Sequence, residues 1–218
     1  MLVLALDSAL DACSAAVVET DGVKALAAES RFMSRGHAEA LLPLVRDVMR
    51  AAATEFRDLD RIAVTVGPGG FTGLRVGLAA ARGLALAAGR PAHGVTTLAA
   101  LAAPVFQDGD GPVAAVLDVR RDEICTQVFR APGEPLTGPA LLPLAEAANR
   151  LPAGIRLVGS GAPALAALDP RFAPVPGTVP DIVWVARLGA RTALTPPRAF
   201  YVRPPDAKPQ DAARTRLP

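Results

Sequence analysis

Four aspartates could carry chemistry, because they form two pairs with the same internal spacing. Asp7 and Asp11 recur as Asp118 and Asp122. Asp7 and Asp118 each end an apolar run, so each carboxylate is expected at the end of a strand, where open α/β sheets carry out their chemistry. Such a carboxylate can hold a phosphate-bound metal ion, or it can accept hydrogen bonds from its own turn. No glycine lies within either pair, which favours the turn, because glycine lets backbone N–H groups reach a phosphate.

A glycine-rich segment could bind an anion. It follows an apolar run and precedes a helical pattern, so its N–H groups are expected at the start of a helix. We expect Thr72 to be the N-cap of that helix, and a simple tight turn is the alternative. No Lys-Ser or Lys-Thr pair follows the last glycine, which excludes a Walker loop. The segment comprises Gly67, Pro68, Gly69, Gly70, Phe71, Thr72, Gly73, Leu74 and Arg75.

Few other side chains are candidates for catalysis or binding. The two histidines, His37 and His93, are far apart in the sequence. A catalytic metal usually has three protein ligands, so both are expected to be structural. Ser160 lies between two glycines but in no Gly-x-Ser-x-Gly motif, which indicates a turn. Arg120 and Arg121 are either a phosphate or RNA contact or solvated loop charges.

These residues must be positioned by alternating strands and helices. Apolar runs and alternation predict strands over residues 2–6, 13–19, 23–30, 61–66, 91–94, 113–118, 123–130 and 155–158. Helical periodicity predicts helices over residues 37–53, 72–88, 97–103, 144–150, 163–168 and 182–194. Pro43 lies inside the first of these helices, so its regular part is expected to begin near Leu41.

The second predicted helix carries a ridge of small residues at every fourth position. Such a ridge lets another backbone approach closely, either within the same lobe or in a partner protein. Each glycine inside a helix costs about 0.8–1.0 kcal/mol relative to alanine, so a close contact is expected to offset that cost. The ridge consists of Gly73, Gly77, Ala81, Ala85 and Gly89.

The order of elements in the second half repeats that of the first, which predicts two related α/β lobes. A turn-rich cluster over residues 107–112 marks the boundary between them. We therefore expect an N-terminal, partner-binding lobe over 1–108, a shorter C-terminal lobe over 109–203 and a disordered tail over 204–218.

The composition narrows the classes of function. The 218 residues are 51% hydrophobic and 4% aromatic, which excludes a disordered chain and disfavours an aromatic platform for nucleic acid. The net charge of +2 is too small to predict autonomous nucleic-acid binding. Cys13 and Cys125 form no CxxC pair and are expected to be buried, reduced thiols. The longest apolar run is too short to span a bilayer, and we expect a cytoplasmic protein with no membrane contact.

The repeated strand, aspartate and returning strand resemble the actin-like ATPase superfamily, which includes sugar kinases and the Hsp70 chaperones. The predicted fold class is therefore α/β, with two related lobes of the actin-like ATPase fold, each a mixed sheet with helices. The resemblance implies a nucleotide cleft between the lobes, at Asp7 and Asp118. Because glycines are missing from both aspartate turns, we expect that cleft to be vestigial.

The chain also resembles the TsaB (YeaZ) family of tRNA threonylcarbamoyladenosine biosynthesis proteins. The resemblance is close over residues 1–105 and loose beyond them, apart from Tyr201 and Arg203. Its most specific block is Gly-Pro-Gly-Gly-Phe-Thr-Gly-Leu-Arg, residues 67–75, in which Gly70 stands where serine is commoner. The other matching segments are residues 4–9, 13–17, 36–43 and 94–98.

The resemblance implies a bacterial, non-catalytic scaffold that activates a TsaD-like transferase. That enzyme attaches threonylcarbamoyl to the tRNA adenosine beside the anticodon, and a TsaE-like ATPase joins the pair. The chain alone is expected to form a homodimer and to bind no metal and no cofactor tightly. ATP is expected to be used by the complex, and tRNA to be reached only through the complex. The implied partner surface consists of Leu41, Leu42, Val45, Val48, Met49, Gly73, Gly77, Ala81 and Leu84.

Two alternatives are an active ATPase or kinase of the actin-like fold and a metallopeptidase of the glycoprotease superfamily. The missing glycines of the aspartate turns disfavour the first. The catalytic paralogue holds a metal with a His-x-x-x-His pair, whereas here Leu41 stands four residues after His37, which disfavours the second.

Overall fold

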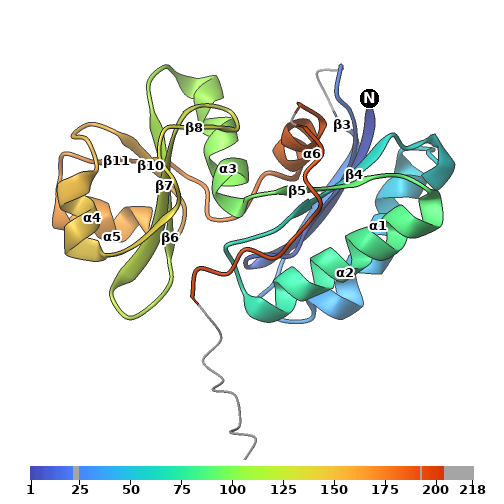
Figure 1. The fold of residues 1–218 in the computed structure, drawn as a ribbon, viewed down its shortest axis with the longest axis horizontal. Coiled ribbons are helices and arrows are strands. Elements are labelled where there is room, and N and C mark those ends of the chain that lie inside the picture. Colours follow the sequence, from blue (N-terminus) through green and yellow to red (C-terminus); the bar gives the residue numbers. More distant parts are fainter. Residues whose placement is uncertain (22–24, 192, 204–218) are drawn as a thin grey trace, which may run out of the picture.

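The computed structural model describes residues 1–21, 25–191 and 193–203, which form two lobes side by side (Figure 1). The predicted tail over 204–218 lies outside the described residues. Most predicted elements are present, with ends that differ by one to three residues. The strands that periodicity missed are short, because two to four residues are too few to show an alternation.

The first lobe is built on a five-stranded sheet with the order β3-β2-β1-β4-β5. β1, β2 and β3 are antiparallel neighbours, whereas β1, β4 and β5 run parallel. The parallel strands are continuous apolar runs because helices cover both faces of the sheet. The strands are β1 (Leu2–Asp7), β2 (Ala12–Glu19), β3 (Ala25–Phe32), β4 (Arg61–Thr65) and β5 (Ala92–Val95).

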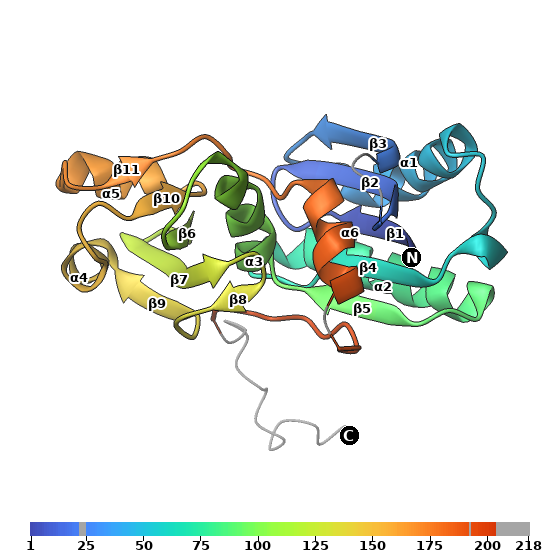
Figure 2. The ribbon, with the colours of Figure 1, turned by 90° about the horizontal axis from the view of Figure 1, so that it is seen from above.

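Three helices and a short 3-10 turn, η1 (Phe56–Asp58), accompany this sheet. α1 (His37–Ala51) and α2 (Phe71–Ala88) cover one face. The other face is covered by α6 (Ile182–Arg191), which follows the second lobe in the chain (Figure 2). Among the described residues, α2 is the one helix long and apolar enough to cross a membrane by length and composition, and it packs here against β4 and α1.

The second lobe repeats this plan with shorter elements. Its sheet has the order β11-β10-β6-β7-β8, with β9 also paired to β7. β6 and β7 are antiparallel and β6 and β10 are parallel, as β1, β2 and β4 are in the first lobe. Its elements are β6 (Val113–Asp118), β7 (Glu123–Ala131), β8 (Glu134–Pro135), β9 (Ala140–Pro143), α4 (Leu144–Arg150), β10 (Arg156–Val158), α5 (Ala162–Leu168) and β11 (Ala173–Pro174).

One of the buried apolar clusters contains residues of both lobes. α3 (Thr97–Ala102) and the 3-10 helix η2 (Ala103–Asp108) lead from the first lobe to the second. Val3 and Ala5 of β1 belong to the same buried cluster as Phe129 of β7. α6 packs on β1, β2 and β4, so by packing it belongs to the first lobe, although the sequence grouped it with the C-terminal lobe over 109–203. The reason is that its buried face completes the cover of the first sheet.

The starts of two helices differ from the prediction. α1 is regular from His37 onward and contains Pro43 in its second turn. The proline is exposed, and buried neighbours such as Leu44 and Val45 hold the helix on the sheet despite the lost backbone hydrogen bond. Gly70, not Thr72, is the N-cap of α2, because the extended backbone ends at that glycine.

From Gly73 to Ala85 the small-residue ridge of α2 packs inside its own lobe, whereas a Cβ on Gly89 would meet none of the described residues within 4 Å. A Cβ on Gly73 would lie 2.0 Å from the carbonyl oxygen of Ser8, and one on Gly77 would lie 2.7 Å from Ser8 Oγ. Ser8 Oγ donates a hydrogen bond to the carbonyl oxygen of Gly73 at 2.9 Å. Ala81 is fully buried beside β4. The ridge therefore lets α2 lie directly on the turn after β1.

Two glycines of α2 provide a matched test of this contact. Gly73→Ala is expected to lower the free energy of unfolding by about 1–3 kcal/mol, because its Cβ overlaps the Ser8 carbonyl. Gly83→Ala is expected to raise it by up to about 1 kcal/mol, because alanine favours the helix and its Cβ meets none of the described residues within 4 Å. Urea denaturation measures both, and equal effects would contradict the contact.

Candidate functional site

A cleft of about 1200 Å³ lies between the lobes. It brings together the turn after β1, the start of α1, the glycine-rich loop and the turn after β6. The superfamily resemblance implied a cleft between the lobes at Asp7 and Asp118, and Asp118 lines this cleft whereas Asp7 does not. The cleft is lined by residues 8–11, 34–39, 68–73, 117–120 and 201–203, with Ser160, Thr178 and Val179.

The two predicted cleft aspartates have different surroundings. Asp7 is fully buried, and its Oδ1 accepts hydrogen bonds from Ala9 N–H at 3.1 Å and from Thr65 Oγ at 2.5 Å. Asp118 is exposed, and its Oδ1 accepts one from Arg120 N–H at 2.7 Å. Both carboxylates therefore cap their own turns, which is the alternative that the missing glycines favoured.

Burial raises the pKa of Asp7 from 3.8 to about 6, against the opposing effect of its two hydrogen bonds. The second oxygen, Oδ2, is buried and has no hydrogen-bond partner among the described residues. Asp7 lies beneath the turn and does not line the cleft. In this conformation its carboxylate is not available to a metal or phosphate in the cleft.

The glycine-rich loop is closed onto the turn after β1. Gly70 N–H donates to the carbonyl oxygen of Ala9 at 2.8 Å, and a Cβ on Gly69 would lie 2.3 Å from that same oxygen. The peptide bond between Gly67 and Pro68 is cis, and Gly67 has a φ of +113°. The glycines are thus used for close backbone packing.

The turn after β6 has an unusual backbone. Arg120, Arg121 and Asp122 are consecutive non-glycine residues with φ of 65°, 61° and 56°. Such left-handed conformations are costly for L-residues and persist where neighbouring structure holds them. Arg203 holds this turn from outside, because its Nη2 donates to the carbonyl oxygen of Arg120 at 3.2 Å and forms an ion pair with Glu123.

The histidines and Ser160 have structural partners. His37 is the first residue of α1, and its Nε2 donates to the carbonyl oxygen of Leu10 at 3.0 Å. His93 is buried in β5, and its Nδ1 accepts from Thr195 N–H at 3.0 Å. Ser160 Oγ accepts from Asp118 N–H at 3.1 Å. In residues 1–21, 25–191 and 193–203, no group of three His, Cys, Asp or Glu side chains could hold a metal ion.

The cysteines are buried and unpaired, as predicted. Burial raises the pKa of Cys13 and of Cys125 to about 11, so both are neutral thiols at physiological pH.

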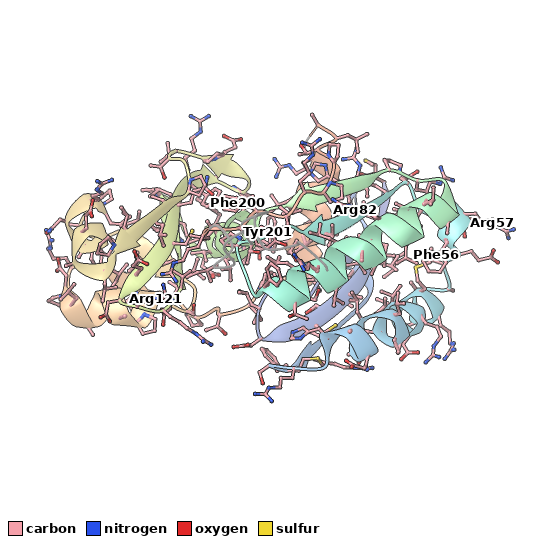
Figure 3. All side chains as sticks on the ribbon, turned by 60° about the horizontal axis from the view of Figure 1, so that its bottom comes forward. Phe56, Arg57, Arg82, Arg121, Phe200 and Tyr201 are labelled. Carbon is pink, nitrogen blue, oxygen red and sulfur yellow. The ribbon has the colours of Figure 1, made fainter. Side chains whose placement is uncertain are left out.

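An aromatic cluster at the mouth of the cleft was not predicted. The Phe71 and Tyr201 rings are 5.4 Å apart, and the Arg75 guanidinium lies 3.7 Å from the centre of the Phe71 ring. Figure 3 shows Phe200 and Tyr201 beside the start of α2. Both parts of this cluster stood out in the sequence, Phe71 and Arg75 in the glycine-rich segment and Tyr201 near the end. Nothing in the sequence indicated that these two segments are in contact.

Most of the implied partner residues lie in the core of the first lobe, which corrects that assignment. They form the stripe by which α1 and α2 pack on the sheet, and an amphipathic stripe normally faces the core. Leu42 is 53% exposed and Leu84 is partly exposed. The buried ones are Leu41, Val45, Val48, Met49, Gly73, Gly77 and Ala81.

The exposed sides of the same two helices form an apolar groove. Its volume is about 450 Å³, and Leu41 contributes to its floor. Of the implied partner residues, Leu41, Leu42 and Leu84 line this groove. The groove is lined by Ala38, Leu41, Leu42, Val76, Ala79, Ala80, Gly83 and Leu84.

Two lobes with this repeated strand order, meeting at a cleft with an aspartate at the end of each first strand, define the actin-like ATPase fold. The predicted fold class is therefore confirmed. A family model described as "TsaD: tRNA N6-adenosine threonylcarbamoyltransferase" matches residues 30–171. The chain belongs to the TsaB (YeaZ) family, as its motifs predict.

Relatives and solved structures support this placement. An uncharacterized protein of Mycobacterium tuberculosis is 34% identical over 213 residues, which cover 95% of this chain and 94% of that protein. The tRNA threonylcarbamoyladenosine biosynthesis protein TsaB of Escherichia coli is 37% identical over 125 residues, 57% of this chain and 53% of that protein. YeaZ from Pseudomonas aeruginosa has a TM-score of 0.73 and 30% identity, covering 87% of this chain and 90% of that one.

A second structure from Pseudomonas aeruginosa is described as an uncharacterized protein with similarity to peptidase YEAZ. It has a TM-score of 0.78 and 29% identity, and the alignment covers 93% of this chain and 99% of that one.

The buried Asp7 predicts a pH dependence of stability. Because folding raises its pKa from 3.8 to about 6, its stabilising contribution is complete below pH 4 and is lost as the pH rises through 6. The loss amounts to about 3 kcal/mol. Asp7→Asn is expected to remove this decline from urea-denaturation curves measured between about pH 4.5 and 8. The matched control is Asp118→Asn, which is expected to keep it, and an Asp7→Asn curve parallel to the wild type would refute the assignment.

Proposed function

We propose that this chain is a non-catalytic scaffold that binds and activates a TsaD-like transferase. The transferase attaches threonylcarbamoyl to the tRNA adenosine beside the anticodon. Curated relatives named tRNA threonylcarbamoyladenosine biosynthesis protein TsaB support the pathway. A relative named tRNA N6-adenosine threonylcarbamoyltransferase is 36% identical over 104 residues and covers 41% of this chain, which supports a common origin of the two partners.

The apolar groove between α1 and α2 is the observation that carries the proposal. Leu42 on α1 is 53% exposed, and it lies in one apolar groove with Leu41, Val76 and Leu84. A contiguous exposed apolar surface of this kind is typical of a protein-binding site. Helices with exposed small residues, such as Ala79 and Gly83, let a partner helix approach closely. A transferase with the same fold would offer the matching pair of helices, and a second copy of this chain would do so when the transferase is absent.

The cleft supports a role without catalysis by this chain. The glycine-rich loop lies on the turn after β1, and Asp7 is buried below it. A nucleotide phosphate would reach Asp7 only if this loop opened. We therefore propose that the assembly with a TsaE-like ATPase uses ATP, that this chain binds no cofactor tightly, and that tRNA binds to the assembly.

The size of the cleft favours one competing function, an active ATPase or kinase. Calorimetry of the purified chain with Mg-ATP separates the two proposals. Sub-micromolar ATP binding with ATP turnover would show that the chain is an enzyme and would refute the scaffold proposal. The scaffold proposal requires that the chain alone neither binds ATP with this affinity nor turns it over.

Exposed leucines on the two lobes provide a matched test of the groove. Leu42→Glu is expected to weaken pairing with the TsaD-like transferase at least tenfold, because it places a charge in an apolar interface. Leu168→Glu, at 52% exposure on α5, is expected to leave pairing unchanged. Pairing is measured by co-purification and size exclusion, with thermal unfolding as the check on folding. Wild-type pairing of Leu42→Glu would exclude the groove.

A depletion experiment tests the pathway itself. Cells that lack this chain are expected to lose threonylcarbamoyladenosine from their tRNA, as measured by mass spectrometry of digested tRNA. Normal modification in such cells would refute the proposed function.

A further inference from the structure

Charge is strongly segregated in this chain, although its net charge is only +2. The chain contains 21 Asp and Glu residues, but none occurs in residues 61–107 or in residues 182–203. The structure brings these two segments together. Phe200 N–H donates to the carbonyl oxygen of Val66 at 2.7 Å, and Gly94 N–H donates to that of Thr195 at 3.0 Å. The surface that these two segments form together therefore carries no carboxylate of their own.

The segment 193–203, which we call the strap, aligns arginines along this region. Arg82 Nη2 on α2 donates to the carbonyl oxygen of Pro197 at 2.5 Å. Arg75 Nε lies 3.5 Å from the Tyr201 hydroxyl. Arg198 is exposed on the strap itself.

The strap ends at the second lobe, where Arg203 holds the carbonyl oxygen of Arg120. The exposed Arg121 follows in the same turn. In Figure 3, Arg121, Tyr201 and Arg82 follow one another across the molecule. Arg82 lies on the side of α2 that faces away from α1. We name Arg75, Arg82 and Arg198 the arginine ridge, and leave out Arg203 because its guanidinium is already paired with Glu123.

Aromatic rings interrupt this ridge. Phe71 is 48% exposed and Tyr201 is 37% exposed, and Arg75 stacks on Phe71. Guanidinium groups bind phosphate through paired hydrogen bonds, and exposed aromatic rings stack on unpaired bases. An acidic peptide would satisfy the arginines but would leave the rings without a matching group. The combination therefore favours RNA over an acidic protein.

We infer that the arginine ridge contacts the sugar–phosphate backbone of the RNA substrate directly, with Tyr201 stacking on an unpaired base. This inference rests on the proposed function, which supplies an RNA to the assembly. It assigns part of the RNA-binding surface to this chain. With only three arginines, the chain alone binds weakly, and the surface is completed in the assembly.

The ridge and the groove use different residues of α2. The strap is contacted by Phe71, Arg75 and Arg82. The groove is lined instead by α2 residues Val76, Ala79, Ala80, Gly83 and Leu84. The two surfaces therefore share no residue, and each can be altered separately.

The test removes two ridge charges and compares them with two charges removed elsewhere. The ridge variant carries Arg75→Gln and Arg198→Gln. The control carries Arg130→Gln and Arg150→Gln, which change the net charge equally on the second lobe, where these arginines pair with Glu134 and Glu146 at the surface. Fluorescence anisotropy measures binding of a labelled, unmodified tRNA transcript to the full chain and to its complex with the transferase, over a series of salt concentrations.

The ridge variant is expected to bind the transcript at least tenfold more weakly. Its slope of log affinity against log salt concentration is expected to fall by about 1.4–1.8, because two phosphate contacts are lost. The control is expected to stay within about twofold of the wild type, because its charges do not face RNA. Tyr201→Leu is expected to lower affinity without changing the salt slope, because stacking involves no counterion release.

Three outcomes would overturn the inference: no binding of the transcript by either the chain or the complex beyond that of the transferase alone, equal loss in the ridge and control variants, or wild-type binding by the ridge variant. Co-purification with the transferase is measured on the same samples. If one of these outcomes is found while the chain still co-purifies with the transferase, the inference fails and the proposed function stands. If the wild-type chain does not pair with the transferase, the proposed function itself is refuted.

Discussion

The architecture depends on one close backbone contact, between the start of α2 and the turn after β1. Gly69 and Gly73 lie against the carbonyl oxygens of Ala9 and Ser8, at distances that no side chain with a Cβ could adopt. This contact sets α2 flat on the sheet and buries Asp7 beneath the turn. It also determines which sides of α2 remain exposed, and so where the groove and the arginine ridge lie. Close packing of this kind transmits any local change, since interiors have little free volume.

Periodicity predicted the elements well because each helix and central strand buries a regular apolar stripe. It could not decide which surface the small-residue ridge faces, since a glycine ridge is equally suited to its own lobe and to a partner. The structure decides it through Ser8, whose approach to Gly73 depends on the whole sheet. The sequence did not separate the buried from the exposed members of the implied partner surface, because buried Val45 and Val48 give a stronger pattern than the exposed Leu42 beside them.

The strap was the part of the site that the sequence could not show. Residues 195–203 have no helical or alternating pattern, and their positions are set by single hydrogen bonds to Val66, Arg82 and His93. The sequence showed the duplication through the repeated aspartates, but it did not show that Asp7 and Asp118 differ in burial. Asp7 is covered because α2 reaches over the first turn, whereas Asp118 stays exposed although Gly161 lies close to its backbone N–H.

The position of α6 has a consequence for how the chain acquires its structure during synthesis. The face of the first sheet that carries Val3, Ala5 and Ala16 is covered by a helix that follows the entire second lobe. On the ribosome, the first five strands emerge before this cover does, so an apolar surface stays open while more than eighty further residues are added. Such surfaces attract chaperones or aggregate. The order of the elements therefore couples the completion of the first lobe to the translation of the second.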